Sequence, residues 1–197
     1  MDKRTRPGAL QIIRNEHVAV AAVLRSLKPM LQRGPGDAPE PFFDVIRAML
    51  FYIDEFPEKR HHPKESDLLF PKLLRAAPQL MPVIEALERD HLSGQPRVRE
   101  LQHLLLAWEF LGDGHRQPFE DAVAGYVDFY LRHMKVEETE LLPLAERCLT
   151  AQDRAELDAA FQANRDLFGP DGHDGAYERL FIRIVMHAPA PIGVGPG

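Results

Sequence analysis

The sequence is poor in cysteine, and Cys148 is the single one among its 197 residues. This excludes disulfide bonds within the chain, zinc sites built on cysteines and iron–sulfur clusters ligated by one chain. Long apolar runs are missing too, because none approaches the ~20 residues that a membrane helix needs. The basic N-terminal stretch lacks the apolar segment of a secretion signal. We therefore expect a chain that does not enter a membrane and that resides in the cytoplasm.

The chain also lacks a stripe of basic residues. It has 24 Lys and Arg against 30 Asp and Glu, a net charge of −6, and the cations are dispersed along the sequence. Nucleic acid is therefore not an expected partner. Hydrophobic residues make up 45% and charged residues 27%, ordinary values for a globular protein with one domain and a full core.

What the sequence does contain is helical periodicity. Apolar residues recur at alternating steps of three and four, which is typical of helices packed in a bundle. Breaks rich in glycine and proline at 33–41 and 112–118 interrupt this pattern. The pattern predicts four long helices, over 8–32, 42–76, 78 or 82 to 111, and 119–148.

The residues that follow predict two shorter helices, over 153–168 and 177–186, and then an extended tail. The expected fold class is all-α: an antiparallel up-and-down four-helix bundle with additional C-terminal helices. We assign residues 8–148 to the bundle. Residues 149–197 form a helical extension and tail of the same domain.

Each long helix carries a histidine at a position where the apolar seam predicts core. These histidines are His17, His61, His91 and His133. In two of the helices a glutamate follows four residues later, Glu65 after His61 and Glu137 after His133. Residues at i and i+4 lie above one another on a helix, about 5.4 Å apart along its axis.

A buried carboxylate without a partner costs several kcal/mol and normally pairs with a cation. If short loops join antiparallel helices, the four histidines lie at the same height within one or two turns. One lone histidine in a seam is usually a core residue, but four at one level with two glutamates indicate a metal site. Imidazole and carboxylate donors without thiolate favour iron or manganese, and zinc stays an alternative.

With these residues the sequence resembles the hemerythrin-like, or HHE cation-binding, family. The similarity rests on His17, on HHPKE at 61–65, on His91 and on HMKVE at 133–137, which together resemble the H–HxxxE–H–HxxxE subtype. It covers about residues 8–148. The resemblance implies a four-helix bundle with two iron ions in a non-haem di-iron centre. It implies that His17, His61, Glu65, His91, His133 and Glu137 bind these ions.

The chain departs from the oxygen-carrying members, which have two histidines one turn apart on the third helix. Here Gln95 stands one turn after His91. Either His62 or water fills the resulting gap, and Pro63 could turn His62 inward by disturbing the helix. An open metal position suggests redox chemistry on a small ligand more than reversible oxygen carriage.

Three functions remain open from the sequence, the last of them a helical bundle that is stabilised by zinc and binds a protein partner. The first is a di-iron protein that binds or reduces peroxide, dioxygen or nitric oxide, with a catalase-like or peroxide-scavenging activity as its enzymatic form. The second is a non-catalytic oxygen or iron sensor, or an iron-binding module. The oligomeric state is not fixed by the sequence.

Several neighbours of the six ligand candidates have weaker roles. Tyr126 and Tyr130 lie on the seam before His133 and are expected in the core, and Tyr130 could also bond a metal ligand. We expect Glu138 beside a ligand or in solvent, and Glu88 and Asp90 in solvent.

Overall fold

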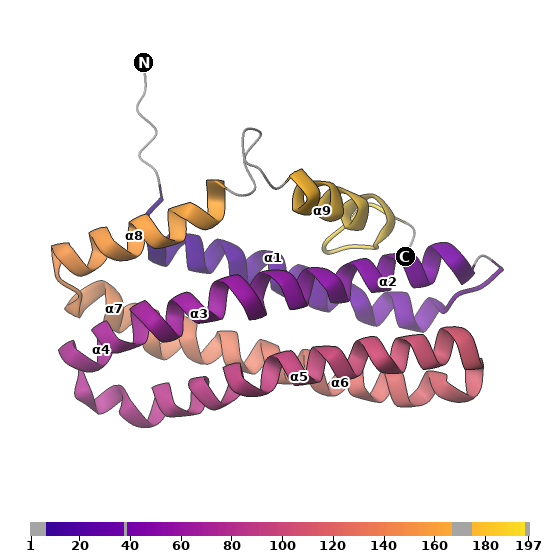
Figure 1. The fold of residues 1–197 in the computed structure, drawn as a ribbon, viewed down its shortest axis with the longest axis horizontal. Coiled ribbons are helices and arrows are strands. Elements are labelled where there is room, and N and C mark those ends of the chain that lie inside the picture. Colours follow the sequence, from indigo (N-terminus) through magenta and orange to yellow (C-terminus); the bar gives the residue numbers. More distant parts are fainter. Residues whose placement is uncertain (1–6, 38, 167–174, 196–197) are drawn as a thin grey trace, which may run out of the picture.

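The computed structural model describes residues 7–37, 39–166 and 175–195, and these residues contain helices and no strand. Four antiparallel rods form the bundle (Figure 1). The first rod is α1 (Ala9–Arg33) and the third is α5 (Met81–Leu111), which follows the short turn η3 (Pro78–Leu80). The expected all-α bundle is confirmed. No helix in the described ranges combines the length and apolar character that a membrane span requires.

The second and fourth rods are composite helices. The second consists of α2 (Pro39–Ile53), η1 (Asp54–His61), α3 (His62–Lys64), η2 (Glu65–Leu69) and α4 (Phe70–Ala76). The fourth begins after η4 (Asp113–His115) and consists of α6 (Arg116–Val136), η5 (Glu137–Leu141) and α7 (Leu142–Cys148).

The segments η1, η2 and η5 are π-helical, so each inserts extra residues into its turns. Each contains a proline or ends two residues before one: Pro57, Pro71 and Pro143. Proline has no backbone N–H and therefore cannot make the normal i to i−4 hydrogen bond. The wider turns carry the glutamates and their neighbours toward the bundle axis.

The same segments correct the predicted seam at two places. The regular three-and-four spacing predicts Leu68 and Leu144 in the core, but both are half-buried. The neighbouring Leu69 and Ala145 are fully buried instead. A π-turn shifts the inward face by one residue, because it contains more residues than an α-turn.

The apolar core has two parts, one on each side of a polar layer. The larger cluster includes Leu27, Ile46 and Trp108. The smaller one, at the other end of the bundle, includes Ile13, Leu73 and Leu141. The seam histidines and glutamates lie between the two.

Helix α8 (Ala151–Asp166) packs on α1, and its Leu157 and Phe161 belong to the smaller core cluster. The last two residues of the helix predicted over 153–168, Phe168 included, lie outside the described residues. At its start Thr150 and Asp153 exchange hydrogen bonds in a capping arrangement. Asp153 also pairs with Arg75 of α4 at 2.6 Å, which ties α8 to the bundle.

Helix α9 (Gly175–His187) packs against α2. The tail that follows it reaches α1, where the buried Ser26 hydroxyl donates to the Pro189 carbonyl at 2.9 Å. The same hydroxyl accepts from the Ile192 N–H at 3.0 Å. One side chain of the bundle therefore fixes the tail whose docking place the sequence did not indicate.

Candidate metal centre

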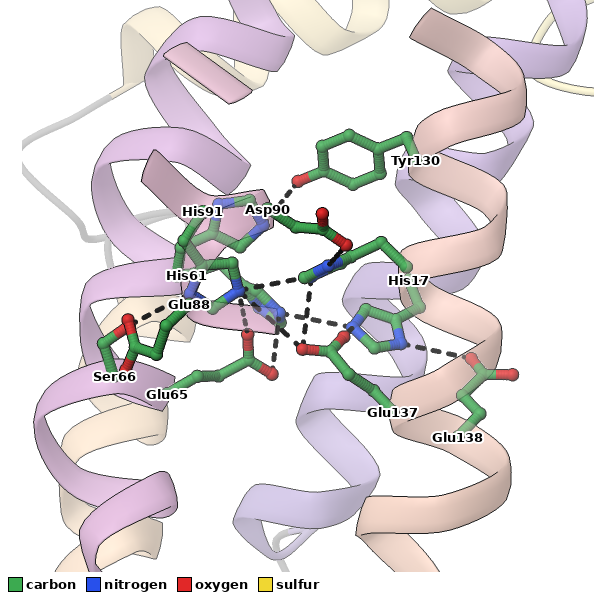
Figure 2. Close-up of polar contacts among 12 residues, drawn as sticks. His17, His61, Glu65, Ser66, Glu88, Asp90, His91, Tyr130, Glu137 and Glu138 are labelled. Atoms are coloured by element: carbon green, nitrogen blue, oxygen red, sulfur yellow. Dashed lines mark hydrogen bonds and ion pairs between the residues drawn. The ribbon is translucent and has the colours of Figure 1, made fainter. Parts of the chain in front are cut away.

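The four seam histidines converge in the polar layer with their Nε2 atoms toward one another, and Figure 2 shows His17, His61 and His91 there. His17 of α1 and His61 of η1 form one pair, with 3.3 Å between their Nε2 atoms. His91 of α5 and His133 of α6 form the other, with 3.2 Å between theirs. Two donors about 2.1 Å from one ion and at right angles are about 3.0 Å apart, so each pair has a spacing that suits a shared ion.

Glu65 and Glu137 reach the space between the pairs from opposite sides (Figure 2). Glu65 Oε1 lies 3.2 Å from His61 Nε2, and its Oε2 lies 3.6 Å from His91 Nε2. Glu137 Oε2 lies 3.3 Å from His17 Nε2, and its Oε1 lies 3.3 Å from His133 Nε2. Each carboxylate therefore points one oxygen at each histidine pair.

These carboxylates are fully buried, and none of their four oxygens accepts a hydrogen bond from the described residues. Buried polar atoms are nearly always satisfied, so the exceptions need an explanation. Two donor groups could hold a metal ion here, each with its ligand atoms within 4.8 Å of one another. The donor groups share Glu65 and consist of His17, His61, Glu65 and Glu137, and of His62, Glu65, His91 and His133.

The outward ring nitrogens are held by a second layer of acceptors. His61 Nδ1 lies 2.6 Å from Glu16 Oε2, and His17 Nδ1 lies 3.2 Å from Glu138 Oε1. Metal-binding histidines usually donate their other N–H to such a group, which fixes the tautomer and leaves Nε2 to the ion.

The second pair has corresponding partners. His133 Nδ1 lies 3.3 Å from Asp90 Oδ2. His91 Nδ1 lies 3.0 Å from Ser66 Oγ, whose hydroxyl donates to Glu88. Asp90 and Glu88, which we expected in solvent, therefore help to hold His133 and His91 in place. Glu138 lies beside the ligand candidate His17, which was one of the two expected positions for it.

The roles of Glu16 and Asp90 were not predicted from the sequence, although a signal was present. Glu16 immediately precedes His17 and Asp90 immediately precedes His91. Each acid supports not the histidine beside it but one on another helix, because successive residues on a helix face different neighbours.

The close packing of histidines and carboxylates changes the pKa values of these groups. Burial lowers the pKa of His133, but Glu137 and the bond to Asp90 outweigh burial and raise it to about 10. Burial likewise opposes a charged His61, yet Glu65 and Glu16 bring its pKa well above the usual value. Burial raises the pKa of Glu137, and the surrounding histidines reverse this and bring it well below the usual value. The two carboxylates therefore stabilise positive charge at the centre.

His62 is buried, as the disturbance by Pro63 suggested, and its ring stacks on His91 with 4.0 Å between centroids. Its Nε2 lies 2.7 Å from the Tyr130 hydroxyl. Its Nδ1 makes no hydrogen bond to a described residue and lies 3.4 Å from Glu58 Oε2. Burial, together with the nearby His91, His133 and His61, brings the pKa of His62 well below the usual value.

Glu58 is another neighbour of the centre whose role was not predicted from the sequence. It is buried one turn before His62 and accepts a hydrogen bond from Tyr126 at 3.1 Å. Burial raises its pKa to about 7. Its carboxylate lies against Gly94 of α5, in space that any larger residue at that position would fill.

A small, largely buried cavity adjoins the centre. The space that the centre of a water molecule can occupy in it is about 10 Å³, which is close to the minimum for one water molecule. Three apolar residues, Val20, Pro57 and Met134, complete its wall between the histidines and Tyr130. The cavity can therefore take an occupant of about the size of one water molecule.

Comparison with known protein families gives one finding. The family described as hemerythrin HHE cation binding domain matches residues 8–145, which include all the ligand candidates. Comparisons with curated proteins and with solved structures find no match.

Proposed function

The chain belongs to the hemerythrin HHE cation-binding family, and from this premise we propose that it holds two non-haem iron ions that bind or reduce a small oxygen or nitrogen species. The observation that carries the proposal is the set of four buried carboxylate oxygens without hydrogen bonds, placed between two histidine pairs. Without metal ions these oxygens make no hydrogen bond to a described residue and depend on protonated histidines for compensating positive charge, whereas bound cations would supply both ligation and charge.

In this proposal His17 and His61 would hold one ion, and His91 and His133 would hold the other. Glu65 and Glu137 would supply carboxylate oxygens to the centre, since each directs its two oxygens at different pairs. His62 belongs to the second donor group and is the candidate for the position that the missing third-helix histidine leaves. The donor set of imidazoles and carboxylates suits iron, while manganese or zinc would be the result of a different metal supply.

Iron would supply electrons and an open position for a small ligand. The protein would select that ligand by size, because the small cavity has room for little more than one water molecule. Dioxygen, nitric oxide and peroxide are of this order, whereas organic substrates are not. Val20, Pro57 and Met134 make part of its wall apolar, and the Tyr130 hydroxyl, which is hydrogen-bonded to His62 Nε2, also lines it.

The test begins with metal analysis of the full chain after reconstitution with ferrous iron. We expect about two iron ions per chain and a charge-transfer absorption. Both should be lost in Glu65→Ala and Glu137→Ala and retained in Glu140→Ala, an exposed glutamate of the same η5 segment. One colourless zinc ion, or no bound metal after reconstitution, would contradict the proposal.

Peroxide then separates the two functional forms. Repeated turnover by the iron-loaded chain indicates a peroxide-scavenging enzyme. A bound adduct without turnover indicates a sensor or an iron-binding module instead.

A further inference from the structure

The small cavity beside the centre has a solvent-open neighbour. A groove of about 640 Å³ runs between α1 and the α6–η5 segment, with Pro191 of the C-terminal tail on its rim. Its walls are mostly small or apolar and include Ala21, Ala22 and Leu131. The groove and the small cavity have two lining residues in common, His17 and Met134. These two side chains therefore lie between the groove and the space beside the centre.

The two side chains differ in freedom. His17 is held through Nδ1, which lies 3.2 Å from Glu138 Oε1. Met134 is 5% exposed and its side chain belongs to the larger apolar cluster. An unbranched thioether side chain with three rotatable bonds adopts alternative conformers easily, and rotamer changes are fast compared with catalytic turnover.

Two cations line the same groove. Arg25 on α1 and Lys135 on α6 are exposed, and neither forms an ion pair with another described side chain. Glu138, the acid of the groove, is already paired with His17. The groove therefore has an excess of positive charge, which attracts small anions.

We propose that small ligands enter from this groove and that Met134 is the gate through which they pass to the metal centre. Arg25 and Lys135 raise the entry rate of anionic ligands and leave that of neutral ligands unchanged. This inference rests on the proposed function, because it concerns the route to the same site.

The test is stopped-flow measurement of nitric oxide and azide binding to the iron-loaded full chain. Met134→Ala should raise the association and dissociation rates of both ligands several-fold by the same factor, so that Kd stays unchanged. Met134→Leu, which nearly conserves volume, should resemble the wild type, and Met134→Phe should slow both rates. Met49→Ala is the matched control, because Met49 is also buried but lies in α2, far along the rod from His61.

A second pair of variants tests the route without touching the core. Arg25→Gln combined with Lys135→Gln should slow azide association by roughly two- to tenfold, with a weaker salt dependence, and leave nitric oxide unchanged. Lys28→Gln, an exposed change on the same helix outside the groove, should alter neither. These exposed variants should fold normally, so they keep the inference testable if Met134→Ala is unstable.

The outcomes separate the two proposals. A wild-type chain that takes up iron but binds neither ligand would overturn the proposed function, and the gate with it. Ligand binding whose rates are the same in all Met134 variants, or whose Kd alone changes, would overturn the gate and leave the proposed function intact. In the iron-free chain, the methyl carbon resonance of Met134 should show exchange between rotamers and that of Met49 should not. A single rigid conformer at Met134 would also count against the gate.

Discussion

Replacing Gly94 by alanine should destabilise the protein, although alanine is normally the better helix residue. Gly94 lies inside α5, and an added Cβ would stand 2.5 Å from Glu58 Oε1 and closer still to Oε2. Glu58 cannot simply turn away, because it is buried and accepts the Tyr126 hydroxyl. Overpacking of this kind costs about 1–3 kcal/mol, against a helix-propensity gain of about 1 kcal/mol.

Gly125 provides the matched comparison. It also lies within a helix, α6, and a Cβ there would meet nothing within 4 Å. Gly125→Ala should therefore stabilise by about 0.5–1 kcal/mol. The difference between the two variants isolates the overpacking cost, and for a chain of this size about 1 kcal/mol corresponds to roughly 2–4 °C in Tm. Thermal unfolding of both metal-free variants under one condition measures it.

A double variant identifies the cause. In a Glu58→Ala background the carboxylate is absent, so Gly94→Ala should no longer be costly, and the two changes should be non-additive. If Gly94→Ala raised Tm as much as Gly125→Ala does, the tight approach between α5 and Glu58 would be refuted.

Three further results are expected. Ser26→Ala removes the hydroxyl that bonds the C-terminal tail twice, so it should cost about 1–3 kcal/mol and increase hydrogen exchange in α9; unchanged exchange would contradict the docking. Glu16→Gln weakens the acceptor behind His61 and should lower metal affinity about 10–100-fold in chelator competition, and an unaltered affinity would exclude that support. The hydrogen bonds of Thr150 bring the pKa of Asp153 below its usual value, so Asp153 contributes stability above about pH 4 that is lost as pH falls. Asp153→Asn should therefore lower Tm at pH 6 and make little difference near pH 3, whereas an equal loss at both values would rule out the charge.

The sequence was sufficient for the helices and for the convergence of their histidines. Periodicity identified the seams, and the positions of His17, His61, His91 and His133 relative to the breaks put them at one height, as the structure has them. The family resemblance is also confirmed, over residues 8–145. That these residues bind metal, and which metal, stays a prediction.

What the sequence could not provide were the features that depend on distant neighbours. A regular 3.6-residue period cannot show a π-turn, so Leu68 and Leu144 were placed one residue from the true inward positions. The role of Glu58 depends on how closely η1 and α5 approach each other, and this distance cannot be predicted from a local sequence pattern. The roles of the acids behind the histidines likewise required the relative rotation of the helices.

The division of the apolar core into two clusters has a consequence for folding. Each cluster draws side chains from all four rods, so each can behave as its own cooperative unit. Between them, the metal-free layer depends on protonated histidines to neutralise its buried carboxylates. Iron would take over this role and act as a cross-link between the two units, so that a metal-free chain should lose cooperativity as the pH rises through the pKa of these histidines and a loaded chain should melt in one step. Loss of metal would thus expose one end of the molecule to proteolysis before the other.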